Sequence, residues 1–240
     1  MEGGALPRPW CASGEAGATG GDWVTDGLAA VLFDMDGLLV DTEPLWFETE
    51  TEVMARLGAP WSKEDQEHLL GGSMEKTVAY LLSKATRPVP PAEIARWMIE
   101  GMLKRAAEGR IVVQPGAREL LAEVAASGIP YALVTSSERE FAEAVLTGTG
   151  FRFPVTVTGD DVPRTKPAPD PYLLAAKLLN AQPEHCVALE DSPNGVASAT
   201  AANCKVVAVP SLLPIPPAEG RLIATSLTEI SLAILQGLVA

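Results

Sequence analysis

Short, almost entirely apolar runs recur along the chain and alternate with stretches whose apolar residues have helical spacing. Strands of a parallel sheet have this apolar character when helices cover both faces of the sheet. Residues 115–126 show the helical spacing between two of the runs. The pattern therefore predicts an α/β fold with a doubly wound parallel sheet of Rossmann-like form. The expected strands are residues 28–33, 130–134, 154–158, 186–189 and 205–209.

Residues 43–112 contain amphipathic stretches but no buried-strand pattern, so we expect them to form an all-helical domain inserted into the sheet domain. Pro44 opens the first of these stretches and Gly58 closes it, which is the usual order of helix start and stop signals. The α/β core then comprises residues 26–42 and 113–240, and residues 1–25 form a flexible N-terminal tail. Within the insertion, the expected helices are residues 44–57, 63–70, 74–84 and 91–108.

Composition narrows the classes of function. The chain has 240 residues and a formal net charge of −13, which argues against nucleic-acid binding because that binding requires Lys and Arg to neutralise phosphates. No apolar stretch of about 18 residues occurs, so we expect no membrane-spanning segment. Three cysteines, Cys11, Cys186 and Cys204, cannot all pair within one chain, and they match no zinc spacing. We therefore expect a protein of the reducing cytoplasm, and the tail lacks the features of a signal peptide.

Candidate chemistry lies directly after the apolar runs, where doubly wound sheets bind their ligands. Asp34 and Asp36 follow the first run, and Glu190 and Asp191 follow the fourth. Their hard carboxylate oxygens suit Mg²⁺, which takes one or two protein carboxylates together with a substrate phosphate. Taken alone, an Asp-x-Asp pair is equally compatible with a turn or a helix cap. Two carboxylate pairs at two strand ends favour a magnesium site.

Lys166 and Thr135 supply the donors that an anionic substrate needs. Lys166 lies in a proline-stiffened loop after the third run, and its charge can offset the repulsion between a carboxylate nucleophile and phosphoryl oxygens. Thr135 follows the second run and can donate a hydroxyl hydrogen bond. A capping hydroxyl at Thr135 and a solvated surface lysine at Lys166 are the alternative interpretations.

Four motifs resemble the haloacid dehalogenase superfamily, in its subgroup of helical-cap sugar phosphatases and β-phosphoglucomutase-like proteins. The likeness spans roughly residues 28–210. It implies the fold described above, with a helical cap that closes over the site. The motifs are Asp34-Met35-Asp36-Gly37-Leu38-Leu39-Val40-Asp41-Thr42-Glu43-Pro44, Val134-Thr135-Ser136-Ser137, Lys166-Pro167-Ala168-Pro169-Asp170 and Leu189-Glu190-Asp191-Ser192-Pro193-Asn194-Gly195-Val196.

The resemblance also implies a role for each motif residue. Asp34 is the nucleophile that forms an aspartyl phosphate, and Asp36 protonates the leaving alcohol and then activates water. Mg²⁺ is held by Asp34, by the main-chain carbonyl of Asp36 and by Asp191, and Glu190 assists through water or by contacting these ligands. The phosphoryl group and the rest of the substrate are expected to contact Thr135, Lys166, Ser136 and Ser137, together with the cap residues Trp46, Ser73, Met74 and Lys76.

The sequence departs from the β-phosphoglucomutases in the cap. The mutase pattern would place Arg near Met74, to hold a second phosphate, and His near Trp46, and this chain has neither. We therefore expect hydrolysis of a small phosphomonoester, a sugar or polyol phosphate, by a monomer or weak homodimer. If Lys76 replaced the missing Arg, the chain would be a phosphomutase, which is the alternative activity. Phosphoglycolate and a nucleoside monophosphate are the alternative substrates. A dehalogenase is disfavoured, because halide loss needs no acid such as Asp36.

Overall fold

A computed structural model describes residues 27–69 and 72–240. The predicted tail, residues 1–25, lies outside the described residues, and Cys11 lies in it. Residues 70 and 71 also lie outside them. The longer elements are β1 (Ala30–Phe33), α1 (Glu43–Leu57), α2 (Lys63–Glu67), α3 (Met74–Lys84), α4 (Pro91–Ala107), α5 (Ala117–Ser127), β4 (Tyr131–Val134), α6 (Arg139–Thr149), β5 (Val155–Val157), α7 (Asp170–Leu178), β6 (Cys186–Glu190), α8 (Pro193–Ala201), β7 (Lys205–Ala208), β8 (Arg221–Ile223) and α9 (Leu232–Gly237).

The six strands of the main sheet are all parallel, in the order β5-β4-β1-β6-β7-β8. β1 lies in the middle, where Val31 pairs with Tyr131 of β4 on one side and with Val187 of β6 on the other. From β1 the chain passes first to β4 and β5 on one side and later crosses to β6 and β7 on the other, so a ligand crevice is expected at the carboxyl ends of these central strands. The doubly wound fold and the five predicted strands are confirmed.

β8 was not predicted from the sequence. It has only three residues, it pairs with a single neighbour at the sheet edge, and its Ile223 is 37% exposed. An edge strand of this kind does not need the continuous apolar run that marks a strand buried on both faces. The sequence pattern therefore recognised the interior of the sheet and missed this edge.

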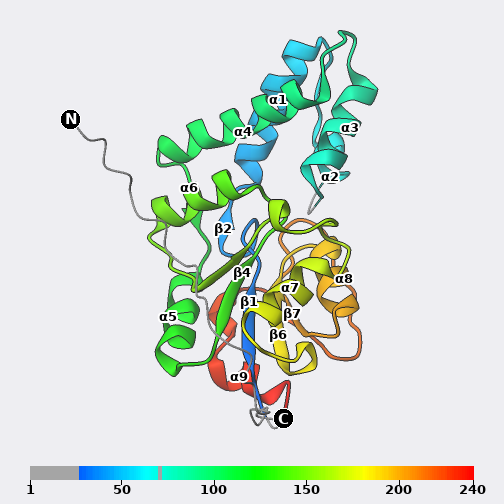
Figure 1. Ribbon diagram of the computed structural model, residues 1–240. Coiled ribbons are helices and arrows are strands. Elements are labelled where there is room, and N and C mark those ends of the chain that lie inside the picture. The colour runs from blue at the N-terminus through cyan, green and yellow to red at the C-terminus, as the bar shows by residue number, and fades with distance from the viewer. Residues whose placement is uncertain (1–26, 70–71) are drawn as a thin grey trace, which may run out of the picture.

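Successive residues of β1 belong to the two opposite faces of the sheet. Val31 and Phe33 pack in a core with apolar residues of α5, α6 and α9. Ala30 and Leu32 pack in a second core with residues of α7 and α8. Strand side chains alternate between faces, so helices on both sides require every β1 position to be apolar. Figure 1 shows the two helical layers on either side of the strands.

Helices α1 to α4, which we call the helical insertion (residues 43–112), lie together beyond one end of the sheet (Figure 1). They have a core of their own, in which Leu57, Leu81 and Met98 are fully buried. Two short strands that the sequence did not predict, β2 (Val40–Asp41) and β3 (Val112–Val113), pair antiparallel where the chain enters and leaves the insertion. At two residues each, they are too short to give a periodic pattern.

Three of the four predicted helices of the insertion match the structure within one residue at each end. The exception is α2, which was expected to reach residue 70 and ends at Glu67. Its start is well defined, because Ser62 and Asp65 form a reciprocal capping box. Within the described part of the chain, no helix has both the length and the apolar character needed to cross a membrane.

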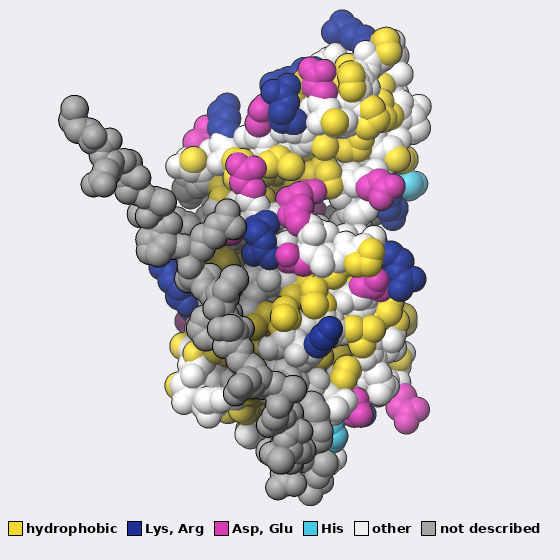
Figure 2. Space-filling view, viewed as in Figure 1, with side chains coloured by type: hydrophobic (Ala, Val, Ile, Leu, Met, Phe, Trp, Pro, Cys, Tyr) yellow, Lys and Arg dark blue, Asp and Glu magenta, His cyan; other side chains and the backbone are white. Residues whose placement is uncertain are grey.

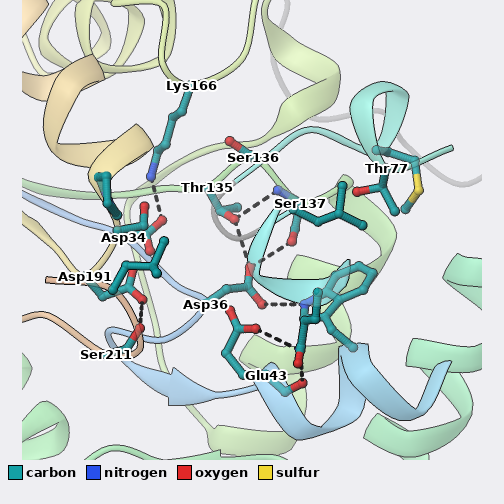
Figure 3. A pocket seen from close by; sticks show the side chains of 18 of the residues that line it. Asp34, Asp36, Glu43, Thr77, Thr135, Ser136, Ser137, Lys166, Asp191 and Ser211 are labelled. Carbon is teal, nitrogen blue, oxygen red and sulfur yellow. Dashed lines mark hydrogen bonds and ion pairs between the residues drawn. The ribbon is translucent and has the colours of Figure 1, made fainter. Parts of the chain in front are cut away.

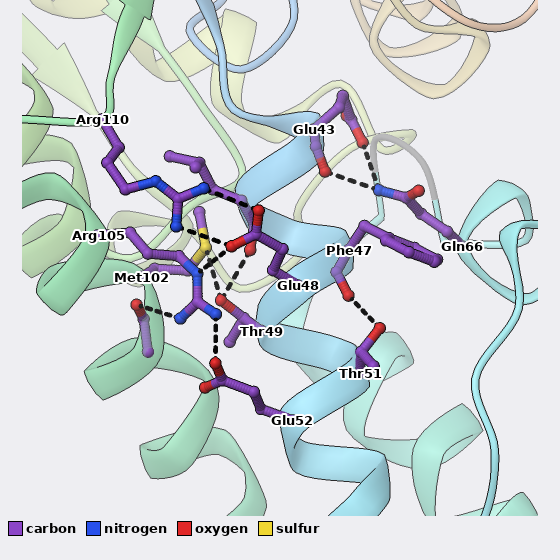
Figure 4. A network of polar contacts seen from close by, with 12 residues as sticks. Glu43, Phe47, Glu48, Thr49, Thr51, Glu52, Gln66, Met102, Arg105 and Arg110 are labelled. Atoms are coloured by element: carbon purple, nitrogen blue, oxygen red, sulfur yellow. Dashed lines mark hydrogen bonds and ion pairs between the residues drawn. The ribbon is translucent and has the colours of Figure 1, made fainter.

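Arg105 of α4 joins the two long helices of the insertion (Figure 4). Its side chain is only 3% exposed, and its guanidinium donates to Glu48 and Glu52 of α1, at 3.3 and 2.8 Å, and to the Gly101 carbonyl. Arg110, beyond the end of α4, donates two further hydrogen bonds of 2.7 Å to Glu48.

On the face of the molecule shown in Figure 2, Lys and Arg side chains are interspersed with Asp and Glu.

We expect Arg105→Ala to lower the free energy of unfolding by about 1–3 kcal/mol, because it removes buried packing and leaves the Gly101 carbonyl without this donor. Arg96→Ala is the matched control, since the Arg96 side chain is 60% exposed and pairs with Glu100 at 3.5 Å on the surface of α4. The control should change stability by less than about 0.5 kcal/mol. Urea unfolding measures the free energy of unfolding of both variants. An equal decrease in both would contradict the structural role of Arg105.

Candidate active site

Three neighbouring strands bring the predicted residues to one place. Asp34 follows β1, Thr135 follows β4, and Glu190 is the last residue of β6. Because these strands are adjacent and parallel, their carboxyl ends meet at the same edge of the sheet, below the helical insertion. Figure 3 shows Asp34, Thr135, Lys166 and Asp191 around one cavity.

Lys166 lies at the floor of this cavity and is almost completely enclosed. Its Nζ donates to Asp34 Oδ1 at 2.5 Å, to Glu190 Oε1 at 2.6 Å and to the Val134 carbonyl at 2.8 Å. Burial alone would lower the pKa of this ammonium group, but the charges of Asp34 and Glu190 outweigh burial and raise it. The lysine therefore remains a cation beside Asp34.

Three buried carboxylates surround this single cation. One ligand oxygen from each of Asp34, Glu190 and Asp191 lies within 4.8 Å of the others. Burial first, and then the charge of Glu190, raises the pKa of Asp34 well above its usual value, and the same two causes raise that of Asp191 to about 8. Glu190 Oε2 is buried and has no hydrogen-bond partner. The excess of negative charge and the hard oxygen donors together fit a divalent cation.

Asp36 points away from this acidic cluster. One of its carboxylate oxygens accepts from the Thr42 hydroxyl at 2.6 Å and from the Trp46 indole at 3.4 Å. The other accepts from the hydroxyls of Ser137, at 2.8 Å, and Thr135, at 3.3 Å. Four donors from two loops and α1 therefore fix this carboxylate in the cavity wall, separate from Asp34 (Figure 3).

Two glycines allow the acidic side chains to occupy their positions. Gly37 has φ +81°, and a Cβ there would lie 2.0 Å from Asp191 Oδ2. In α8, a Cβ on Gly195 would lie 1.9 Å from Glu190 Oε2. The turn between β6 and α8 is fixed by Ser192, whose hydroxyl accepts from the Gly195 amide at 3.1 Å. Both glycines thus leave the space that the carboxylates fill.

Most of the substrate residues predicted from the sequence line the cavity. Trp46, Met74, Ser136 and Ser137 are among the lining residues, and the buried Ser136 hydroxyl has no hydrogen-bond partner. Ser73 and Lys76 are not. Ser73 instead caps α3 by accepting from the amide of Lys76, whose side chain is exposed.

Several site residues were not selected from the sequence. Glu43 and Glu50 line the cavity, and with Trp46 they have the i, i+3, i+7 spacing of one helix face in α1. That spacing was visible in the sequence and could have identified them. Tyr172 donates to Glu190 Oε1 at 2.5 Å, and Ser211 donates to Asp191 Oδ2 at 2.6 Å. These two had no comparable signal.

A family model described as haloacid dehalogenase-like hydrolase matches residues 31–209. The chain belongs to this family. It is 36% identical over 194 residues to Protein CbbY from Cereibacter sphaeroides, covering 76% of this chain and 84% of the relative. It is 34% identical over 188 residues to hexitol phosphatase B from Escherichia coli, and this match covers 77% of this chain and 84% of the relative. The family predicted from the four motifs is confirmed.

A solved structure extends the family likeness to three dimensions. It is a mutant of CbbY from Rhodobacter sphaeroides in complex with xylulose-(1,5)bisphosphate, and it matches this chain with a TM-score of 0.80 at 32% identity. The match covers 87% of this chain and 99% of that one. The haloacid dehalogenase-like fold therefore includes both the sheet domain and the helical insertion.

Gly195→Ala should lower the free energy of unfolding by about 1–3 kcal/mol, because the added methyl group overlaps the carboxylate of Glu190 that Lys166 and Tyr172 hold in place. Gly148→Ala in α6 is the matched control, since a Cβ there meets nothing within 4 Å. The free energy of unfolding of the control should rise by about 0.5–1 kcal/mol, because alanine favours the helix more than glycine does. Urea unfolding of both variants measures the difference, and a neutral Gly195→Ala would show that Glu190 is free to move.

Proposed function

We propose that this chain is a Mg²⁺-dependent phosphatase that hydrolyses a small phosphomonoester, a phosphorylated sugar or polyol, through an aspartyl-phosphate intermediate. The observation that carries the proposal is the separation of two carboxylates in one cavity. Asp34 lies against Lys166 at the floor, whereas Asp36 is held by hydroxyl and indole donors in the wall. The two groups are thus equipped for different roles, nucleophile and acid-base.

In the first step, a carboxylate oxygen of Asp34 attacks phosphorus and the bond from phosphorus to the leaving oxygen breaks. Asp36, in its protonated form, gives its proton to that oxygen, so the leaving group departs as a neutral alcohol. In the second step, Asp36 accepts a proton from water, which attacks the phosphoryl group and releases inorganic phosphate from Asp34. Lys166 offsets negative charge, and the unpaired Ser136 hydroxyl is available to a phosphoryl oxygen.

Mg²⁺ would be held by Asp34, Asp191 and the main-chain carbonyl of Asp36. Glu190 would support it from the second shell, since its Oε1 is already engaged by Lys166 and Tyr172. The ion, when bound, neutralises charge on the phosphoryl oxygens. Lys166 alone cannot balance the three buried carboxylates, which supports a second cation in this site.

The helical insertion, residues 43–112, would act as a cap on the core formed by residues 26–42 and 113–240. Its hinges would lie at Asp41 and Thr42 and near Gln114 and Pro115, beside the short β2-β3 pair. Gln114 supports this, because its side chain donates to the Gly37 carbonyl at 3.0 Å and so joins the exit of the insertion to the catalytic loop. We also infer a cytoplasmic protein, since Cys186 and Cys204 are free thiols.

Asp34→Asn should lower the rate of Mg²⁺-dependent phosphate release by at least about 10⁴-fold, because it removes the nucleophile. It should not lower the melting temperature, since a buried negative charge is also removed. Phosphate release is measured over a panel of hexitol, hexose, nucleoside and glycolate monophosphates, with and without EDTA. Asp160→Asn, at an exposed position, is the control and should retain wild-type rates.

Two results would contradict the proposal. Wild-type-like turnover by Asp34→Asn would refute the nucleophile, and no turnover of the whole panel by the wild-type protein would refute the phosphatase. Isomerisation of a hexose phosphate that requires a bisphosphate, with little free phosphate released, would instead identify the mutase alternative.

A further inference from the structure

Acidic side chains line both ends of the cavity. Among the described residues that line it, the only Lys or Arg is Lys166 at the floor, which is already paired with Asp34 and Glu190. The opposite end is built from the helical insertion and carries two carboxylates, Glu43 and Glu50, both from α1. The leaving group of a substrate bound at Asp34 would face this acidic end.

Glu50 is a buried carboxylate with spare hydrogen-bonding capacity. The residue is 3% exposed, and one oxygen accepts from the Trp61 indole at 3.0 Å. Its other oxygen makes no hydrogen bond within the described part of the chain. Glu43 is similar, since among the described residues only the Gln66 amide donates to its carboxylate, at 3.2 Å. Burial raises the pKa of both groups to about 8, so at neutral pH each is largely protonated and can donate as well as accept a hydrogen bond.

The neighbours of these carboxylates are neutral. Gln66 and Thr77 line the same end and offer an amide and a hydroxyl, each able to donate and to accept. Trp46 lies between Glu43 and Glu50 on the same face of α1 and offers an aromatic surface to the carbon-bound hydrogens of a sugar chain. Together these groups match a chain of neutral hydroxyls, and they offer no cation to a second anionic group.

We propose that Glu43 and Glu50 select a neutral, polyhydroxylated leaving group by accepting hydrogen bonds from its hydroxyls, and reject substrates that carry a second phosphate or a carboxylate at that end. The proposal rests on the phosphatase function above and makes it more specific. Rejection follows because a second phosphate or a carboxylate would enter a poorly solvated end of the cavity, where the described lining residues offer no cation to pair with it. The preferred substrates are hexitol or hexose monophosphates.

The first test compares kcat/KM of the wild-type protein, with Mg²⁺, for a hexitol 6-phosphate, fructose 1,6-bisphosphate, phosphoglycolate and phosphoethanolamine. We expect kcat/KM for the hexitol phosphate to exceed that for both anionic substrates by at least about 100-fold, because the second anionic group would be buried without a cation. Comparable use of the bisphosphate would overturn the proposal. A preference for phosphoethanolamine would also overturn it, by showing that the carboxylates select a cation.

The second test replaces the carboxylates by isosteric amides. Glu50→Gln should raise KM for the hexitol phosphate about tenfold, because the amide replaces one of the two carboxyl oxygens that can accept from the substrate hydroxyls. It should also lower the ratio of kcat/KM for the hexitol phosphate to kcat/KM for the bisphosphate. Glu43→Gln should lower the same ratio. Glu100→Gln is the control, as Glu100 is exposed on α4 and lies outside the cavity lining. An unchanged ratio in both cavity variants, with melting temperatures like the wild type, would refute the assignment.

p-Nitrophenyl phosphate separates failure of this inference from failure of the phosphatase function. Its leaving group has no hydroxyl chain, so its hydrolysis depends on Asp34 and Mg²⁺ but not on selection of a polyol. Turnover of this compound without any preference for the hexitol phosphate would refute the selection by Glu43 and Glu50 and leave the phosphatase intact. No turnover of any compound would refute the phosphatase itself.

Discussion

The site depends on one buried ion pair, in which Lys166 lies between Asp34 and Glu190. These residues come from the ends of two neighbouring strands and from the loop before α7, so the pair fixes the relative position of three segments at the centre of the sheet. Replacing Lys166 by a neutral residue would leave the negative charges of Asp34 and Glu190 uncompensated in a nearly solvent-free position. Catalytic geometry and local stability therefore rest on the same contacts.

The pair also creates a charge imbalance. Lys166 neutralises only part of a cluster that includes Asp191, and the unsatisfied oxygen of Glu190 shows that protein donors do not complete it. Gly37 and Gly195 leave the space that the acidic side chains fill, so these carboxylates can lie close together. A site constrained in this way holds negative charge at a fixed place, where a metal ion and a phosphoryl group together can compensate it.

The start of α1 connects the chemistry at the floor with the helical insertion. Thr42, just before the helix, and Trp46, one turn into it, both donate to Asp36. Glu43 and Glu50 lie on the same helix and reach the same cavity. A movement of the insertion would therefore change the donors that hold Asp36 and, at the same time, move the residues that face the leaving group. Substrate selection and the positioning of the acid-base group thus both depend on α1.

The sequence by itself determined the sheet, its central strands and the residues at their carboxyl ends, because parallel strands with covered faces must be apolar and must end at one edge. It could not determine which residues of the insertion reach the cavity. Glu43 and Glu50 were visible as one helix face, but the direction of that face is set by tertiary contacts of α1, among them the ion pairs of Glu48 and Glu52 with Arg105. For the same reason Ser73 and Lys76 lie outside the cavity lining although they are close in sequence to Met74. Helical periodicity defines a face, whereas its direction depends on contacts between residues far apart in the chain.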